Sequence, residues 1–376
     1  MRKNILKTLA LAAPIAFGSC DFVDDFKGED DDTPISGLHF IDEYVIPDGE
    51  IFQNTLVGGL SGIDYALGSW YLISDDPEAP IRFYTANIDF DRDGFNEVAL
   101  NAVTELKDAD GMSFEQGTVD PEAIRIMDNM VIWTSEGNIN NSVDPFVRKA
   151  ELDGTFVSEA GLNDRFSVSM DDNVGPRQNG TFEGVSLSTD GTGYWVAMEL
   201  PLRQDGPAPM INDTNSPVRL VFIDEATGES GREYAYELDP VVRPATNGTS
   251  FEINGVVELL QVEKDKFFVL ERSFATGYAD GGNNVRIYEV DVSLATDVSN
   301  RESLQETPYN SVSKKLLFDF ESIRGELTGG VVDNIEGITF GPNFANGNRS
   351  LVLVADNNFS AFGPQLNQFV LFELVD

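Results

Sequence analysis

Basic residues, histidine and cysteine are all scarce in this chain of 376 residues. It has 25 Lys and Arg against 64 Asp and Glu, with one His, one Cys and a formal net charge of −39. Because nucleic acids are bound through basic surfaces, we expect no nucleic-acid partner. The lone cysteine, Cys20, excludes an intrachain disulfide. The lone histidine, His39, argues against Ser-His-Asp triads and His-ligated zinc.

Several enzyme signatures are also missing. The chain has no P-loop and no dinucleotide-binding fingerprint. It has no Gly-x-Ser-x-Gly elbow either, since Gly59-Leu60-Ser61-Gly62 has the wrong spacing. Beyond the N-terminal segment, no apolar run is long enough to span a bilayer. Any hydrolysis must therefore depend on carboxylates, a metal ion that activates water, and arginines.

The N-terminus is typical of a targeting segment. Basic residues precede an apolar run over residues 9–17, and Gly18-Ser19-Cys20 follows. We interpret residues 1–19 as a signal peptide. The position of Cys20 resembles a bacterial lipobox, which predicts that this cysteine is lipidated after cleavage. The alternative is an ordinary signal peptide with an unrelated cysteine.

An acidic stretch follows this cysteine, and we interpret residues 20–36 as a solvated tether. A stretch of this kind resembles the surface-export signal of Bacteroidetes lipoproteins. We therefore expect a monomer held by a lipid anchor in a membrane, at the bacterial outer membrane or cell surface.

One pattern then recurs five times. Each copy has a turn, a small or acidic residue, Gly (once Ala), alternating apolar residues, a second turn and a short apolar strand that ends in an acid. The copies span residues 60–75, 121–136, 182–199, 253–271 and 335–356. Repeated β-hairpins of this kind predict a β-propeller.

Two further strand-like segments follow each of the first four hairpins, but only one, residues 369–374, follows the fifth. The N-terminal segment 38–46 supplies the missing strand, and its pairing with the C-terminal strand would close the ring. We therefore predict an all-β fold over residues 37–376, a propeller of five four-stranded blades. A sixth, degenerate blade is the alternative.

The start of the first strand of a hairpin lies beside the end of the second, which brings acids into pairs. The expected neighbours are Glu122 with Glu136, Glu183 with Glu199, Glu336 with Asp356, Asn254 with Glu271, and Ser61 with Asp75. Because these strand ends converge in a propeller, we predict a ring of carboxylates at one mouth of the central channel. Such a set of oxygens suits Ca²⁺. The alternative is that each acid binds backbone amides at its strand end.

Arginines near these strand ends supply the opposite charge. Arg272 follows Glu271 directly, Arg177 precedes the third hairpin, and Arg203 lies close after Glu199. Together with Ca²⁺ they could hold a small anionic substrate, such as a phosphate or carboxylate ester. The alternative for each arginine is a local salt bridge.

A separate candidate metal site lies between the third and fourth strands of the first repeat. Asp89, Asp91 and Asp93 occupy positions 1, 3 and 5 of an EF-hand-like loop, with Gly94 at position 6. Position 12 is not acidic, so Glu97 at position 9 would complete the ligand shell. The loop predicts a structural Ca²⁺ site, and the alternative is an ordinary Asp-rich hairpin turn.

Several of these motifs together resemble a known family. They include Leu60-Ser61-Gly62-Ile63, Pro121-Glu122-Ala123-Ile124, Phe182-Glu183-Gly184-Val185, Glu336-Gly337-Ile338 and Ala355-Asp356-Asn357-Asn358-Phe359. This set is similar to the phytase-like β-propeller proteins described as having esterase-like activity. The resemblance implies a secreted propeller and phosphoester or ester hydrolysis assisted by Ca²⁺. True β-propeller phytases have six blades and a Lys- and Arg-rich cleft, from which this chain departs.

Our hypothesis is a surface-anchored, phytase-like hydrolase of phosphate or carboxylate esters. Its candidate catalytic residues are Glu183, Glu199, Glu336, Asp356 and Arg272. Its candidate substrate-binding residues are Arg177, Arg203, Glu122, Glu136, Glu271 and Asp75. One alternative is a sugar lactonase, because Glu336-Gly337-Ile338 with Val354-Ala355-Asp356-Asn357 also resembles regucalcin-type lactonases. The other is a non-catalytic propeller that binds a ligand or protein.

Overall fold

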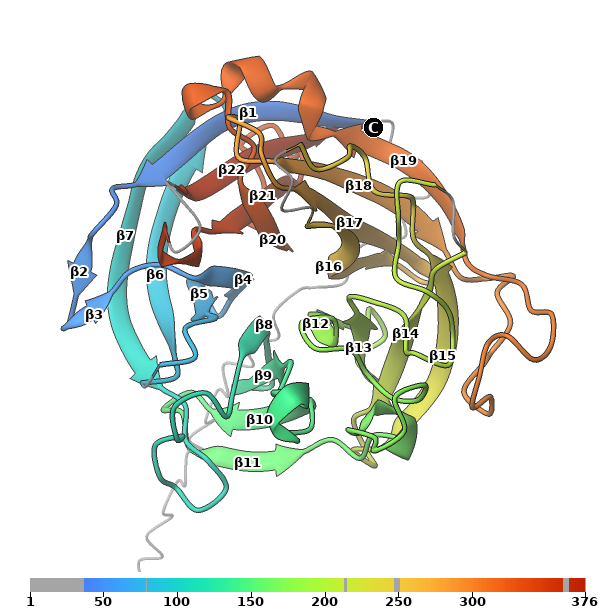
Figure 1. Cartoon of the computed structure of the whole chain (residues 1–376). Helices are drawn as coiled ribbons and strands as arrows, with labels where there is room; N and C mark the ends of the chain where they lie inside the picture. Colours follow the sequence, from blue (N-terminus) through green and yellow to red (C-terminus); the bar gives the residue numbers. More distant parts are fainter. Residues whose placement is uncertain (1–36, 79, 213–214, 247–250, 361–364, 376) are drawn as a thin grey trace, which may run out of the picture. The chain divides into compact units, whose positions relative to one another are not determined.

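The computed structural model describes residues 37–375, except residues 79, 213–214, 247–250 and 361–364. These residues form five four-stranded antiparallel sheets that surround a common centre (Figure 1). The predicted five-bladed propeller is confirmed, and the described residues contain no sixth four-stranded sheet. The predicted signal peptide, Cys20 and the acidic tether lie outside the described residues.

Each blade is named here by its order around the ring, and its strands are given from the centre outwards. Blade 1 contains β4 (Leu60–Ala66), β5 (Ser69–Ser74), β6 (Arg82–Asp91) and β7 (Gly94–Glu105). Blade 2 contains β8 (Pro121–Met127), β9 (Met130–Ser135), β10 (Phe146–Glu151) and β11 (Phe156–Glu159). Blade 3 contains β12 (Phe182–Leu187), β13 (Gly193–Met198), β14 (Pro217–Asp224) and β15 (Ser230–Glu237).

Blade 4 contains β16 (Glu252–Glu263), β17 (Lys266–Ala275), β18 (Asn283–Asp291) and β19 (Ser313–Asp319). Blade 5 contains β20 (Asn334–Phe340), β21 (Ser350–Asp356), β22 (Asn367–Val375) and β1 (Gly37–Ile46). The small hairpin of β2 (Ile51–Phe52) and β3 (Thr55–Leu56) precedes blade 1. Short 3₁₀ turns occur at η1 (Ile139–Asn141), η2 (Asp164–Phe166), η3 (Phe320–Ser322), η4 (Arg324–Glu326), η5 (Thr328–Gly330) and η6 (Asn358–Ser360). Among the described residues, no helix has the length and apolar character needed to cross a membrane.

The ring closes through the two ends of the described chain. Strand β1 pairs antiparallel with β22, from Gly37 opposite Val375 to Ile46 opposite Asn367. This pairing completes blade 5 with the N-terminal strand, as the sequence predicts. Closure leaves two edges on each sheet, the innermost strand beside the channel and the outermost strand at the rim.

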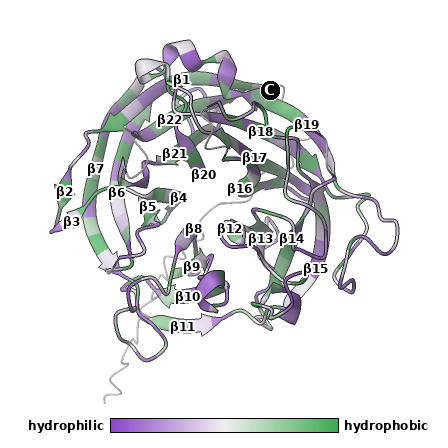
Figure 2. Cartoon of the chain, in the orientation of Figure 1, coloured by the Kyte–Doolittle hydropathy of each residue, from purple (hydrophilic) through white to green (hydrophobic). Residues whose placement is uncertain are grey.

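The core lies between the blades, because each sheet buries both of its faces against its neighbours. Strands such as β13 and β21 are buried along their whole length. Outer strands are less buried, and β7 and β19 both have exposed positions. Figure 2 shows apolar and polar residues along both of these strands.

The repeated glycine lies where the innermost strands come closest. Strand β4 packs between β8 and β20 at the centre of the ring (Figure 1). A Cβ on Gly62 would lie 2.9 Å from the carbonyl oxygen of Glu122, and one on Gly337 would lie 3.0 Å from the amide nitrogen of Ile63. Only glycine, or alanine as in blade 2, therefore fits at this point of the repeat.

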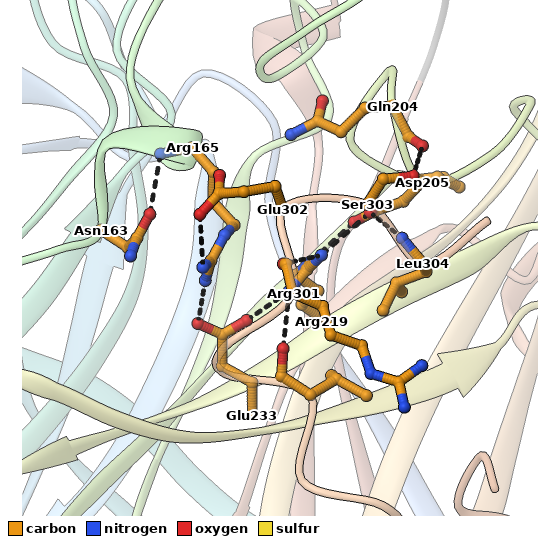
Figure 3. A network of polar contacts seen from close by, with 12 residues as sticks. Asn163, Arg165, Gln204, Asp205, Arg219, Glu233, Arg301, Glu302, Ser303 and Leu304 are labelled. Carbon is orange, nitrogen blue, oxygen red and sulfur yellow. Dashed lines mark hydrogen bonds and ion pairs between the residues drawn. The ribbon is translucent and has the colours of Figure 1, made fainter. Parts of the chain in front are cut away.

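A buried network of ion pairs fastens long loops onto blade 3 (Figure 3). Arg219 on β14 donates to both Asp205 oxygens, at 2.6 and 2.9 Å, and to Glu233 at 2.7 Å. Arg165 donates to the other Glu233 oxygen at 2.6 Å and to the Ser299 carbonyl at 2.9 Å. The loop between β18 and β19 is thereby joined to the neighbouring blade.

We predict that Arg219→Met lowers the free energy of unfolding by about 3–5 kcal/mol, since it leaves two buried carboxylates without their main partner. The measurement is urea unfolding. Lys266→Met removes a half-exposed pair with Glu263 and serves as the control, with an expected cost of about 1 kcal/mol or less. Equal costs for the two variants would contradict the prediction.

Candidate functional site

A β-bulge directs one side chain of most innermost strands towards the channel. The strand register shifts between Leu60 and Gly62 in blade 1, and between Phe182 and Gly184 in blade 3. Equivalent shifts in blades 2 and 5 surround Glu122 and Glu336. A bulge adds an unpaired residue and redirects its side chain. The unpaired residue of the bulge is the one before the repeated glycine. Its side chain, a carboxylate in blades 2, 3 and 5, can therefore leave the plane of the sheet.

Eight acids gather at this end of the channel, and we call this group the acidic mouth. It consists of Asp75, Asp120, Glu122, Glu136, Glu183, Glu199, Glu336 and Asp356. Within it, carboxylate oxygens of Asp120, Glu122 and Glu136 lie within 4.8 Å of one another. Oxygens of Glu136, Glu183 and Glu199 meet the same limit. Glu136 therefore belongs to two groups of potential cation ligands.

Hydrogen bonds hold some of these acids in place. The amides of Gly180 and Thr181 both donate to Glu136 Oε1 at 2.6 Å. Asn334 Nδ2 donates to Glu336 at 2.9 Å and to Asp356 at 3.0 Å, and so fixes these two acids together. No side-chain donor or backbone amide in the described part of the chain donates to Glu122, although its exposed fraction is only 8%.

Arg272 is the only base in ion-pair contact with the acidic mouth, within the described residues. Its Nη2 lies 3.3 Å from Glu199 Oε1 and 3.3 Å from Glu336 Oε1. Its Nε–H is buried and has no hydrogen-bond partner. One guanidinium facing eight acids leaves a large negative charge uncompensated.

Burial and mutual repulsion raise the pKa values across the acidic mouth. Desolvation raises the pKa of Glu136 to about 7 and that of Glu199 to about 7, and Glu199 itself adds to the effect on Glu136. Desolvation, with Glu136 and Asp356 nearby, raises the pKa of Asp120 to about 7. For Glu122, Glu183 and Glu336 the pKa is also raised well above its ordinary value, again mainly by burial. Such shifts mark a site that requires a counter-charge.

A second layer of polar residues lies one step further along the innermost strands, and we call it the channel floor. It consists of Asp64, Arg125, Ser186, Glu258 and Thr339, one from each blade, and all five are buried. Asp64 accepts hydrogen bonds from the Ile126 amide at 2.8 Å and from the Thr339 hydroxyl at 3.2 Å.

The Arg125–Glu258 pair links all five innermost strands across the channel. Arg125 on β8 donates to the carbonyls of Ile63 on β4, at 2.7 Å, and Ile338 on β20, at 2.9 Å. It also pairs with Glu258 on β16 at 2.9 Å, and Glu258 accepts from the Val185 amide on β12 at 2.8 Å. Most polar groups of the floor are thus hydrogen-bonded within it, although the Nε–H of Arg125 has no partner.

The predicted site residue Glu271 lies elsewhere, and its assignment to the mouth needs correction. Its partners are Tyr236 at 2.5 Å, Asn254 at 2.7 Å and Lys314 at 2.6 Å. The predicted pairing of Asn254 with Glu271 is confirmed. However, the register of blade 4 is regular from Glu252 to Val256 and shifts only between Val256 and Glu258, and successive residues of a strand face opposite sides. Arg272 therefore faces the mouth, and Glu271 faces blade 3.

Arg177 and Arg203 do not contact the acidic mouth. Arg177 donates to the carbonyls of Pro201 and Gly206, both at 2.9 Å. Burial and the nearby charge of Arg203 lower the pKa of Arg177. The alternative for each arginine was a local salt bridge. Within the described residues, neither Arg177 nor Arg203 forms one.

The EF-hand-like prediction is corrected by the geometry of its loop. Asp91 pairs with Gly94 in a tight hairpin, and Asp89 and Glu97 lie opposite each other inside β6 and β7. Asp91 Oδ1 accepts from the Asp93 amide at 2.7 Å, as in an ordinary Asp turn. A strand pairing of this kind cannot wrap around an ion, and these acids form no group of three near one another.

Sequence reasoning missed Asp120 and the whole channel floor. Asp120 directly precedes the recognised Pro121-Glu122 motif, so its position in the turn indicated that it lies at the mouth. Arg125 and Glu258 are single charges within apolar strands, flanked by Ile124 and Ile126 and by Val257 and Leu259. Because a buried charge requires a partner, their opposite signs indicated a pair.

A family model, described as "Phytase-like: Esterase-like activity of phytase", matches residues 55–359. The chain belongs to this family. The match includes every acid of the mouth and all five residues of the floor, and it confirms the resemblance seen in the repeats. A comparison with curated proteins gives no match.

Solved structures resemble this phytase-like propeller in fold only. A GH43 β-1,3-galactosidase has 9% identity and a TM-score of 0.43, with 87% of this chain and 94% of that chain covered. The GH43 endo-arabinanase from Bacillus licheniformis has 10% identity and a TM-score of 0.36, with 84% and 94% covered. The GH32 β-fructofuranosidase from Bombyx mori has 10% identity and a TM-score of 0.40, with 90% and 62% covered. Similarities this low carry no argument about chemistry.

The raised pKa values predict a pH-dependent stability. The folded state of the metal-free protein keeps protons on Glu136 and Glu199 up to pH about 7, whereas the unfolded chain releases them near the ordinary value of 4.5. Their stabilising contribution is therefore fully present below pH 4.5 and is lost as the pH rises to about 7. Urea unfolding across pH 4.5–8 measures this loss.

The double variant Glu136→Gln with Glu199→Gln should flatten this part of the pH profile, because neither amide titrates. Glu151→Gln, an exposed change on β10, should leave the profile unchanged. Identical pH profiles for the wild type and the double variant would contradict the prediction.

Proposed function

We propose that this phytase-like propeller is a Ca²⁺-assisted hydrolase of phosphate or carboxylate esters, with its active site at the acidic mouth. One observation carries the proposal: eight clustered acids, most of them buried, face a single arginine. Protein interiors rarely keep so many acids together without a positive partner, because desolvation and repulsion both oppose it. A bound cation would supply the missing charge.

The donor set fits a hard cation. Every potential ligand is an oxygen, and Ca²⁺ takes six to eight oxygen ligands in flexible geometry. Glu136, Glu183 and Glu199 would hold one ion, and Asp120 and Glu122 offer further oxygens beside Glu136. Glu122, buried and without a donor, has no other evident partner. When bound, the ion would polarise the ester and favour attack by water.

The remaining residues have distinct roles in this proposal. Arg272 would hold the anionic part of the substrate through its unpartnered Nε–H. Glu336 and Asp356, fixed by Asn334, would take the proton that water releases. Burial raises the pKa of Asp356 to about 6, which suits proton transfer near neutral pH. The channel floor would keep these groups in position.

We further propose that the protein is a lipid-anchored monomer at the bacterial surface. Gly37, the first described residue, pairs with Val375, whereas the mouth end of blade 5 carries Asp356 and Asn367. The chain therefore enters the propeller at the end opposite the acidic mouth.

Purified protein should hydrolyse 4-nitrophenyl phosphate or 4-nitrophenyl acetate with Ca²⁺ and lose this activity with a chelator. Glu183→Gln should lower kcat/KM by about 100-fold or more, since it removes a carboxylate from the site. Glu151→Gln is the matched control on an exposed strand and should keep wild-type activity. Release of 4-nitrophenol is the readout.

The same assay separates the alternative functions. Turnover of a γ-lactone but of neither ester would favour a sugar lactonase. Calcium that only stabilises the protein, with no turnover of any of these substrates, would favour a binding propeller and would overturn the proposed hydrolase.

Lipidation has its own test in cells. In the native host, Cys20→Ser should move the protein from the membrane fraction to the soluble fraction, because the thioether to the lipid cannot form. Fractionation followed by immunoblotting measures the change. A Cys20→Ser variant that stays in the membrane fraction would contradict the proposed anchor.

A further inference from the structure

A strained turn follows the last acid of the mouth. Asn358, Phe359 and Ser360 all have positive φ, at 43°, 46° and 57°. For residues other than glycine this left-handed conformation costs about 1–2 kcal/mol per residue. Such strain persists only where the surroundings impose it, and it concentrates at active sites and ligand clamps.

Hydrogen bonds with neighbouring residues fix the shape of this turn. Asp356 Oδ1 accepts from the Asn358 amide at 2.6 Å. Asn357 Oδ1 accepts from the Phe359 amide at 3.2 Å and from the Gly59 amide at 3.0 Å, which ties blade 5 to blade 1. The Ser360 amide donates to the Asn357 carbonyl at 2.7 Å. The turn is therefore rigid beside the mouth.

The turn places the ring of Phe359 on the backbone of Gly58 and Gly59. A Cβ on Gly58 would lie 3.0 Å from ring atoms Cδ1 and Cε1. A Cβ on Gly59 would lie 2.7 Å from Cε2 and would collide with Asp75 Oδ1. The two glycines thus make room for the ring, and the ring lies next to the carboxylate of Asp75. Phe359 is only half-buried.

We propose that Phe359 determines the substrate class, by stacking against a ring in the organic part of the ester. The inference rests on the proposed hydrolase. An aromatic ring beside a charged site offers an apolar surface next to the polar groups that bind the ester. The hydrogen bonds of the turn keep this ring beside Gly58, Gly59 and the carboxylate of Asp75, at the rim of the mouth. Esters of aryl alcohols are therefore preferred over esters of short alkyl alcohols.

The test uses Phe359→Gly, since glycine adopts positive φ without strain. We expect KM for 4-nitrophenyl phosphate to rise about tenfold, with kcat changed less than twofold and with unchanged KM for ethyl phosphate. Asn358→Gly is the matched control, because it relieves the same strain and keeps the ring. Phe359→Tyr should retain the wild-type KM.

A binding measurement distinguishes failure of this inference from failure of the proposed hydrolase. With Ca²⁺ present, calorimetry should show that phenylphosphonate binds the wild type more tightly than methylphosphonate, and that Phe359→Gly removes the difference. This result would support the ring contact even if no ester is hydrolysed. Equal affinities in the wild type, equal KM values for Phe359→Gly and wild type, or a parallel loss on aryl and ethyl substrates would each overturn the inference.

Discussion

The ion pair of Arg125 and Glu258 underlies the rest of this structure. It crosses the centre of the propeller and, through carbonyls and amides, contacts the innermost strand of every blade. A buried ion pair is costly unless its remaining hydrogen-bonding groups are satisfied, and here most of them bond to strand backbone. The pair therefore fixes where the strands lie relative to the axis, in the layer next to the acidic mouth.

The two polar layers at the centre have opposite character. In the channel floor, Arg125 balances Glu258, and Thr339 and a backbone amide satisfy Asp64. In the acidic mouth, one arginine faces eight acids. The charged groups of the floor bond to one another and to strand backbone, whereas most acids of the mouth lack a basic partner, and this difference separates a structural layer from a layer that binds. The contrast supports a cation at the mouth, since both layers are built on the same strands.

The strained backbone at the mouth is likewise held by the residues around it. The left-handed turn after Asp356 is held by side-chain acceptors from Asp356 and Asn357, and by the paired glycines of blade 1. Its energetic cost is offset by the closed ring, because blades 1 and 5 are locked together through Gly59 and Asn357. A propeller can thus hold a rigid rim from chain segments that lie far apart in sequence.

The repeats alone predicted the all-β propeller fold, five blades with six as the alternative, the pairing of the N-terminal strand with the C-terminal strand, and most acids of the mouth. These features follow from local patterns, since alternation and turn residues act within a hairpin. Only the tertiary structure decided that Glu271 turns away while Arg272 faces the channel, because the bulge of blade 4 lies after Gly255, between Val256 and Glu258, and not before it. It also decided that Asp89, Asp91, Asp93 and Glu97 form a tight hairpin, and that Arg125 and Glu258 meet across 133 residues of sequence. The pairing of Arg125 with Glu258 depends on ring closure, which brings strands far apart in sequence to one axis.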